Sequence, residues 1–334
     1  MKVYGGLFPD LDIVPARIRE LEDLGYDVVM TTEIAHDPFF PLLLAAEHSQ
    51  RVDLVTSVAI AFARNPMTLA GIAHDLNAYS RGRFILGLGS QIKPHITRRM
   101  SMPWSKPAAR MREFILAMRA IWDCWYQGRP LDFRGEFYTH TLMTPMFTPL
   151  DIESGPPRVM LAGVGPRMTR VAGEVADGFL AHSFTTARYM REVTLPALER
   201  GLAASGRSRS DFEIACAVLT VSGADEQAYE ASRQEVCQRI AFYGSTPAYR
   251  PVLERHGWGD LQSELRALSK QERWAEMGAL IEDDILEEFA IVAEPEEIPS
   301  LLKERYGGLM DSWICSVDTG DPVRQGAMLR ALQQ

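Results

Sequence analysis

Three side chains that can move protons lie close together near the amino terminus. Glu33, His36 and Asp37 fall within five positions, directly after an apolar run typical of a strand. Ser90 and His95 follow a later apolar run in the same way. Carboxyl and imidazole groups are the usual proton donors and acceptors of enzymes. The acids also suit the first turn of a helix, which stabilises negative charge, so proton transfer and helix capping both stay open.

A glycine-rich turn gives the chain a candidate anion site. Gly163, Val164 and Gly165 end another apolar run, and Pro166 then opens a helical stretch. Small residues before a helix leave backbone N–H groups accessible at the positive end of the helix dipole, where phosphate binds well. Proline suits the first turn of such a helix. A tight strand-to-helix turn without a ligand is the alternative.

Several familiar sites are excluded by their motifs. Two Gly-x-Gly sequences lack the third glycine of the dinucleotide-binding fingerprint, because Ile92 and Met168 stand at that position. The chain has no Walker sequence, no H-E-x-x-H and no G-x-S-x-G. Its seven histidines show no ligand spacing, so we expect no metal site. Its four cysteines are scattered without a C-x-x-C, and we expect free thiols.

The composition is that of a globular, water-soluble chain. Of 334 residues, 46% are hydrophobic and 24% are charged, which excludes a disordered chain, a collagen and a small disulfide-stapled scaffold. The net charge of −9 gives no electrostatic attraction to nucleic acid or to an anionic membrane. No apolar run approaches the roughly 18 residues of a membrane span, and the amino terminus lacks a signal-peptide pattern. We expect a cytoplasmic protein of the size of an enzyme, with no nucleic-acid or membrane partner.

The elements that must position these side chains alternate between strands and helices. Helices are expected, for example, at Val14–Leu24 and Pro66–Tyr79. Strict alternation implies a parallel sheet, and eight units fit a closed (β/α)8 TIM barrel, an α/β fold. An open, doubly wound sheet is the alternative. We expect one domain over residues 1–334, with insertions at about 128–156 and 246–287. The eight predicted strands are Val3–Phe8, Asp27–Thr31, Asp53–Phe62, Arg83–Gly89, Arg158–Ala162, Gly178–His182, Phe212–Val221 and Asp311–Val317.

A barrel would gather the candidate residues at one end. Chemistry in this architecture sits where the strands end and the following loops begin. The third strand, which passes through Ser57 and Val58, is expected to end in a bulge. His182 and Ser183 follow the sixth strand. We therefore expect all of these side chains at the carboxyl mouth of the barrel.

Five short segments occur in a fixed order along the chain: Leu24-Gly-Tyr-Asp27, Arg64-Asn-Pro66, Ser80–Gly89 (SRGRFILGLG), Ala162-Gly-Val-Gly-Pro166 and Ala176-Asp-Gly178. Their order and spacing resemble the luciferase-like monooxygenase superfamily over essentially the whole chain. Within it, the chain is most similar to the branch of oxidoreductases that depend on the deazaflavin coenzyme F-420.

The resemblance implies a bacterial luciferase-like barrel with FMN or coenzyme F-420 at its carboxyl mouth. It also implies a non-proline cis peptide at Ser57–Val58, pressed against the cofactor ring, and a cofactor phosphate on the turn Gly163–Gly165. Members commonly pair through barrel helices two and three, so we expect a homodimer. The predicted cofactor-binding residues are Glu33, Ser57, Val58, Ser90, Gly163, Val164, Gly165, Pro166, His182 and Ser183.

The chain departs from the deazaflavin enzymes at two positions. Several of them carry a glutamate proton donor just past the fourth strand, where Ile92 aligns here. They also place a histidine directly after the acid that ends the second strand, whereas here two apolar residues separate that acid from His36. His36, Asp37 and His95 remain as the candidates for catalytic proton transfer.

The predicted activity is hydride transfer between coenzyme F-420 and a small organic substrate, with the cofactor supplying the chemistry. An FMN-dependent monooxygenase that uses molecular oxygen is one alternative. A non-catalytic flavin-binding barrel is another, which the missing glutamate keeps open.

Overall fold

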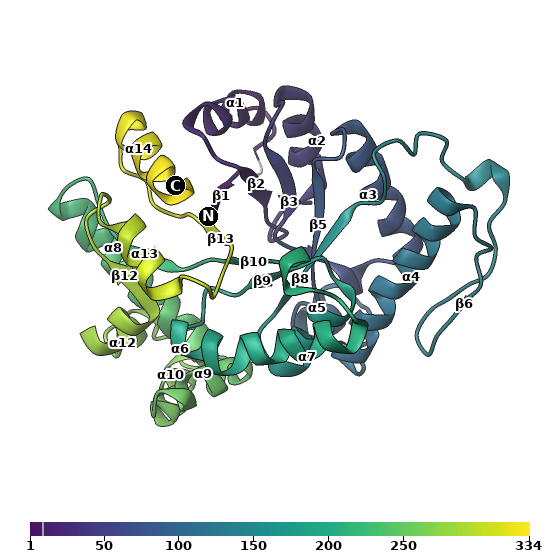
Figure 1. The fold of residues 1–334 in the computed structure, drawn as a ribbon. Helices are drawn as coiled ribbons and strands as arrows, with labels where there is room; N and C mark the ends of the chain where they lie inside the picture. The colour runs from purple at the N-terminus through teal and green to yellow at the C-terminus, as the bar shows by residue number, and fades with distance from the viewer. Residues whose placement is uncertain (9) are drawn as a thin grey trace.

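Eight strands close into a parallel barrel in the computed structural model, which describes residues 1–8 and 10–334 (Figure 1). Each strand pairs in parallel with the next, and the last pairs with the first. The predicted (β/α)8 TIM barrel is thereby confirmed. In order, the strands are β1 (Lys2–Gly6), β2 (Val28–Thr31), β3 (Asp53–Thr56), β5 (Phe84–Gly89), β8 (Arg158–Gly163), β9 (Gly178–Ala181), β10 (Glu213–Cys216) and β13 (Ser312–Ile314).

Helices surround the barrel and begin and end on residues suited to those places. Gly25, at φ 97°, ends the first helix in the left-handed conformation that glycine tolerates. The side chain of Asn65 accepts the N–H of Met67 at 2.8 Å and so caps the third. These outer helices are α1 (Val14–Leu24), α2 (Phe39–His48), α3 (Pro66–Tyr79), α4 (Pro107–Gln127), α5 (Pro166–Val175), α7 (Leu195–Ser205), α8 (Glu226–Gly244), α13 (Ile298–Tyr306) and α14 (Pro322–Gln333).

Two predicted strands are each divided in the structure. The run Asp53–Phe62 forms β3, then a break, and then β4 (Ala59–Ile60), which pairs with β5. The run Phe212–Val221 leaves the barrel after β10. Its second half, β11 (Leu219–Val221), pairs in parallel with β12 (Ala290–Val292) in a separate two-stranded sheet. The prediction of one continuous strand was wrong for Phe212–Val221, whereas the break in Asp53–Phe62 lies at Ser57 and Val58, where a bulge was expected.

The segment 128–156 lies outside α4, at the right of Figure 1. It contains a short antiparallel pair, β6 (Phe133–Arg134) and β7 (Thr139–His140). The Glu113 carboxylate of α4 accepts the N–H groups of Phe137 at 2.6 Å and Tyr138 at 2.7 Å, which fixes the turn of this hairpin. Farther along, Asp151 lies 3.2 Å from the buried ring of His74 on α3.

The segment 246–287 folds into short helices beside α8, at the lower left of Figure 1. They are α9 (Arg250–Arg255), α10 (Gly259–Ser269), α11 (Trp274–Gly278) and α12 (Asp283–Phe289). With α8 and the β11–β12 pair they enclose an apolar cluster separate from the two clusters of the barrel, with members such as Ile240, Val252, Leu265 and Phe289. We call this the insertion cluster.

The barrel has an inner and an outer apolar layer. Side chains of alternate strand residues meet inside it, among them Tyr4, Val28, Ile85, Met160 and Leu180. The intervening residues pack against the helices. None of the helices formed by residues 1–8 and 10–334 is both long and apolar enough to span a bilayer.

The four cysteines are free, as predicted. On α2, Phe40 and Leu43 are exposed apolar side chains. The homodimer expected through this helix and α3 stays a prediction.

Candidate functional site

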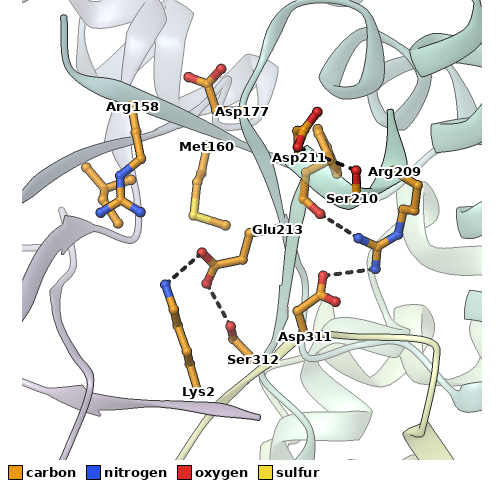
Figure 2. A pocket seen from close by; sticks show the side chains of 12 residues that line it. Lys2, Arg158, Met160, Asp177, Arg209, Ser210, Asp211, Glu213, Asp311 and Ser312 are labelled. Carbon is orange, nitrogen blue, oxygen red and sulfur yellow. Dashed lines mark hydrogen bonds and ion pairs between the residues drawn. The ribbon is translucent and has the colours of Figure 1, made fainter. Parts of the chain in front are cut away.

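The amino end of the barrel holds an open pocket of about 450 Å³ (Figure 2). Two ion pairs and a hydrogen bond join polar side chains of its lining. Lys2 lies 3.4 Å from Glu213, Arg209 lies 2.9 Å from Asp311, and Ser312 donates to Glu213 at 2.7 Å. These contacts connect the amino ends of β1, β10 and β13, which indicates a role in holding the barrel together.

Tyr4 completes this arrangement from inside the barrel. Its hydroxyl donates to Glu213 at 2.6 Å. Burial raises the pKa of Tyr4 well above its ordinary value, and the neighbouring carboxylate raises it further. Burial alone would also raise the pKa of Glu213, but the hydrogen bonds from Tyr4 and Ser312, together with Lys2, lower it. Glu213 is therefore an ionised, fully partnered carboxylate rather than a candidate acid.

The carboxyl end of the barrel is built differently, from small or half-exposed residues. Side chains alternate along a strand, so the residues two positions beyond the inner layer also face the axis. Met30, Ala162 and Ala217 are half-exposed there, and Gly6 is exposed. Apart from Met30, the residues of this layer are glycine or alanine. We call it the mouth layer, consisting of Gly6, Met30, Gly89, Ala162 and Ala217.

One edge of the mouth layer is formed by Ser57 and Val58. The peptide bond between them is cis, as the resemblance implied. The side chain of Val58 lies directly over Gly89, because a Cβ at Gly89 would be 2.5 Å from its Cγ2. The segment that follows is held by Glu33, whose carboxylate accepts the N–H of Ile60 at 2.7 Å. Glu33 therefore stabilises the backbone at Ile60, two residues after Val58.

Arg64 links the two acids that follow β2. Its guanidinium donates to Glu33 at 2.6 Å and to Asp37 at 3.2 Å. It also lies 5.3 Å from the centre of the Phe39 ring. Asp37 accepts the N–H of Phe39 at 2.8 Å, where α2 begins. The cap position of α2 is Pro38, which makes no side-chain cap, and Asp37 lies one residue before it. The role of Asp37 in proton transfer stays a prediction.

The other predicted polar residues lie on the rim. His36 and His95 are exposed, and His95 opens a short helical turn, His95–Arg99. Ser90 donates to the carbonyl of Gln91 at 3.1 Å. Ile92, at the position of the family glutamate, is exposed as well. The structure does not bring His36 or His95 into contact with the other predicted residues that it describes, and their catalytic role stays a prediction.

The turn between β8 and α5 has the form expected of an anion site. Gly165 precedes α5, which has no side-chain cap and no acidic residue in its first turn. The space around Gly165 is open, whereas a Cβ at Gly163 would lie 3.0 Å from Cγ of Met168. Val164 is half-exposed, and Pro166 is exposed. The first N–H groups of α5 are therefore available to a negatively charged group.

His182 is the predicted residue with the most defined surroundings. It follows β9 directly and therefore lies at the carboxyl end of the barrel. The backbone N–H of Phe184 donates to its Nδ1 at 3.0 Å, and its Nε2 lies 3.2 Å from the hydroxyl of Tyr249. Burial lowers the pKa of His182 to about 4, so the ring is neutral at ordinary pH. Ser183 beside it is half-exposed.

Sequence reasoning missed the aromatic residues around His182. The ring of Tyr243, on α8, meets the imidazole edge-on at 4.6 Å, and that of Tyr249 lies at 4.9 Å. Nearby, His256 lies 2.9 Å from the hydroxyl of Thr186. The segment 246–287 is thus attached to the loop after β9 at two points. In the sequence, Tyr243 and Tyr249 are two tyrosines in separate segments. Nothing in their positions indicates that they contact His182.

His182 makes the stability of the protein depend on pH between about 4 and 6.5. Its folded pKa of about 4 lies below the ordinary value of 6.5, so in this window the unfolded chain binds a proton that the folded chain excludes. The free energy of unfolding therefore rises with pH across the window, by at most about 3 kcal/mol. We expect His182→Gln to flatten this rise in urea denaturation at several pH values. Parallel curves for the variant and the parent protein would contradict the expectation.

Comparisons with known proteins were consistent with this geometry. The family model for luciferase-like monooxygenases matches residues 2–312. A Mycobacterium tuberculosis protein of uncharacterised function is 55% identical over 291 residues, 87% of this chain and 86% of that protein. A second protein of that organism, provisionally named a coenzyme F-420-dependent oxidoreductase, is 30% identical over 93% of this chain and 92% of its own length.

Among solved structures, the coenzyme F-420-dependent tetrahydromethanopterin reductase of Methanopyrus kandleri superposes with a TM-score of 0.78. The two are 22% identical, and the superposition covers 99% of this chain and 97% of that chain. At this identity the likeness concerns the fold, and it agrees with the closed barrel described above.

Proposed function

Because this chain belongs to the luciferase-like monooxygenase family, a family of oxidoreductases, we propose that it transfers hydride between coenzyme F-420 and a small organic substrate. The observation that carries the proposal is the mouth layer. Small residues there cover the barrel core thinly, beside the uncapped start of α5. That combination suits a molecule with a flat ring at one end and a phosphate at the other.

The residues present fit such a cofactor. Ser57 and Val58 would support the ring from one side, and Gly163, Val164 and Gly165 would hold the phosphate. Pro166, Ser183 and Ser90 line the same rim. When bound, the deazaflavin would supply a carbon that gives or accepts hydride.

The protein's own part is to position and to shield. Glu33 and Arg64 hold the backbone beside Val58, so that this edge keeps its shape. His182 and its tyrosine neighbours form an uncharged wall on another side of the mouth. The helices of residues 246–287 extend this wall and would exclude water from a substrate held over the ring.

Titration of the purified protein with coenzyme F-420 and with FMN tests which cofactor it binds. We expect F-420 fluorescence to change on titration with the purified protein, and F-420 to bind more tightly than FMN. Tighter FMN binding, with oxygen consumption by the reduced complex, would favour the monooxygenase alternative that the family description supports. Tight cofactor binding without turnover over a broad substrate panel would favour the non-catalytic alternative.

Gly165→Asp tests the phosphate end of the proposed site. Its backbone at φ −87° accepts a side chain, and an aspartate before α5 would cap the helix. We expect the free energy of unfolding to rise by a few tenths of a kcal/mol. The affinity for F-420 should fall about tenfold, because the new carboxylate repels the phosphate. Gly71→Ala, on α3, is the control, because a Cβ there also meets open space. Unchanged affinity in Gly165→Asp would contradict the assignment.

A further inference from the structure

The hydrogen bonds of His182 determine which of its ring nitrogens carries the proton. The N–H of Phe184 occupies Nδ1 of His182, so this nitrogen carries no proton of its own. The neutral ring must therefore be protonated at Nε2, and it donates from there to the hydroxyl oxygen of Tyr249 at 3.2 Å. The phenolic hydrogen of Tyr249 is then free to point elsewhere.

Among the described residues, the hydroxyl of Tyr249 forms its hydrogen bond with His182. Tyr249 is half-buried, at the end of the turn Pro247–Tyr249, and its ring packs against His182 and Phe184, which follow the carboxyl end of β9. A hydroxyl that accepts from one side and has its own hydrogen unused is arranged to donate to a third group. The mouth layer is where that third group would lie.

Aromatic rings surround this pair. Burial lowers the pKa of His182, and burial followed by the nearby Tyr243 raises the pKa of Tyr249 to about 12; no ionised side chain of the described residues contributes to either shift. The rings that touch the pair are those of Tyr243 and Phe184. Such a wall has no cation to neutralise an anionic substrate, so it favours an uncharged one.

The acids that follow β2 are already engaged. Glu33 and Asp37 bind Arg64 and backbone N–H groups, and His36 and His95 are exposed on the rim. The reduction of a carbonyl needs a proton donor that is protonated at ordinary pH. Tyr249 carries such a proton, and it is bonded to His182 at the carboxyl end of β9.

We propose that Tyr249, held by His182, donates the proton to the oxygen of an uncharged ketone or aldehyde as that substrate is reduced. The inference rests on the proposed function. The carbonyl carbon receives a hydride from the reduced deazaflavin, the C=O π pair moves to oxygen, and the O–H bond of Tyr249 breaks to give the alcohol. The tyrosine oxygen regains a proton from water while Nε2–H of His182 stabilises its negative charge. Oxidation of the alcohol runs the same steps in reverse.

Tyr249→Phe is the test, with cyclohexanone as the probe and the F-420-loaded protein as the sample. We expect kcat for its reduction to fall at least a hundredfold, with KM and the affinity for F-420 unchanged within about twofold. A readout independent of turnover is the infrared C=O stretch of cyclohexanone bound to the oxidised holoprotein. It should lie at lower frequency in the parent protein than in Tyr249→Phe, because only the parent donates a hydrogen bond to it.

Two further variants separate chemistry from packing. Tyr189→Phe removes a hydroxyl from a buried tyrosine of the insertion cluster and should leave kcat and the C=O stretch as in the parent protein. His182→Gln retains an N–H donor for Tyr249 and should lose less kcat than His182→Leu.

The outcomes distinguish this inference from the proposed function. Failure of the parent protein to bind F-420 would overturn both. Binding of F-420 with no reduction of cyclohexanone, or with equal kcat and equal C=O stretch in parent and Tyr249→Phe, would overturn the role of Tyr249 and leave the proposed cofactor standing.

Discussion

The Gly87→Ala variant is expected to lose about 3 kcal/mol or more of its free energy of unfolding. A Cβ at this position would lie 1.8 Å from the carbonyl oxygen of Thr56 and 2.9 Å from Cδ1 of Leu180. Thr56 also forms two hydrogen bonds with Gly87. Its hydroxyl donates to the Gly87 carbonyl at 2.7 Å and accepts the Gly87 N–H at 2.9 Å. A methyl group can therefore enter only if β3 and β5 separate.

Urea denaturation of the parent protein and the variant measures this loss. The matched control is again Gly71→Ala, in the middle of α3. It should gain about 0.5–1 kcal/mol, because alanine suits a helix interior better than glycine. A Gly87→Ala protein with the stability of the parent would mean that the two strands are not packed as closely as the structure has them.

Replacing Glu33 with alanine is expected to affect both stability and cofactor binding. The side chains of Glu33 and Arg64 are only 13% and 15% exposed, so the ion pair at 2.6 Å is poorly screened by water. Alanine leaves the N–H of Ile60 without its acceptor and Arg64 with Asp37 as its remaining carboxylate. We expect a loss of about 2–4 kcal/mol in unfolding free energy. The affinity for F-420 should fall at least tenfold, because the backbone beside Val58 loses its support.

Glu33→Gln divides this effect into its parts. Glutamine keeps an acceptor for the N–H of Ile60 but lacks the charge that pairs with Arg64. The stability and the F-420 affinity of this variant should therefore lie between those of the parent protein and those of Glu33→Ala. Glu20→Gln removes the exposed partner of Arg17, a pair at 2.7 Å, and should change stability by less than about 0.5 kcal/mol. If Glu33→Ala bound F-420 like the parent protein, the supporting role of Glu33 would be refuted.

The barrel could be predicted from the sequence because its signals are local. Each strand is a short apolar run, and each helix has its own apolar period and its own ends. Pro66 and Asn65 mark where α3 begins, and Gly25 marks where α1 ends. The turn Gly163–Gly165 was also found locally, because a strand, small residues and a helix follow one another directly. The cis bond at Ser57–Val58 came from the family resemblance rather than from the residues alone.

What could not be predicted depends on contacts between distant parts of the chain. The division of Phe212–Val221 arises because Leu219 pairs with Ala290, which no local pattern indicates. The run Phe212–Val221 is mostly apolar along its whole length, so its composition is that of a single strand. The contact of Tyr249 with His182 spans 67 positions. The bond of Glu33 to the N–H of Ile60 could not be predicted either, because it depends on where the third strand breaks.

The insertion cluster separates what this chain must preserve from what it is free to vary. The pairing of β11 and β12 flanks α8 and the segment 246–287, whose helices share an apolar interior with Phe184 and Tyr189 from beyond β9. We expect substitutions on α9, α10 or α12 to be absorbed mainly within that interior, while the strands and the mouth layer keep their geometry. In descendants of this gene the wall over the mouth, and with it the choice of substrate, can therefore diverge faster than the cofactor platform beneath it.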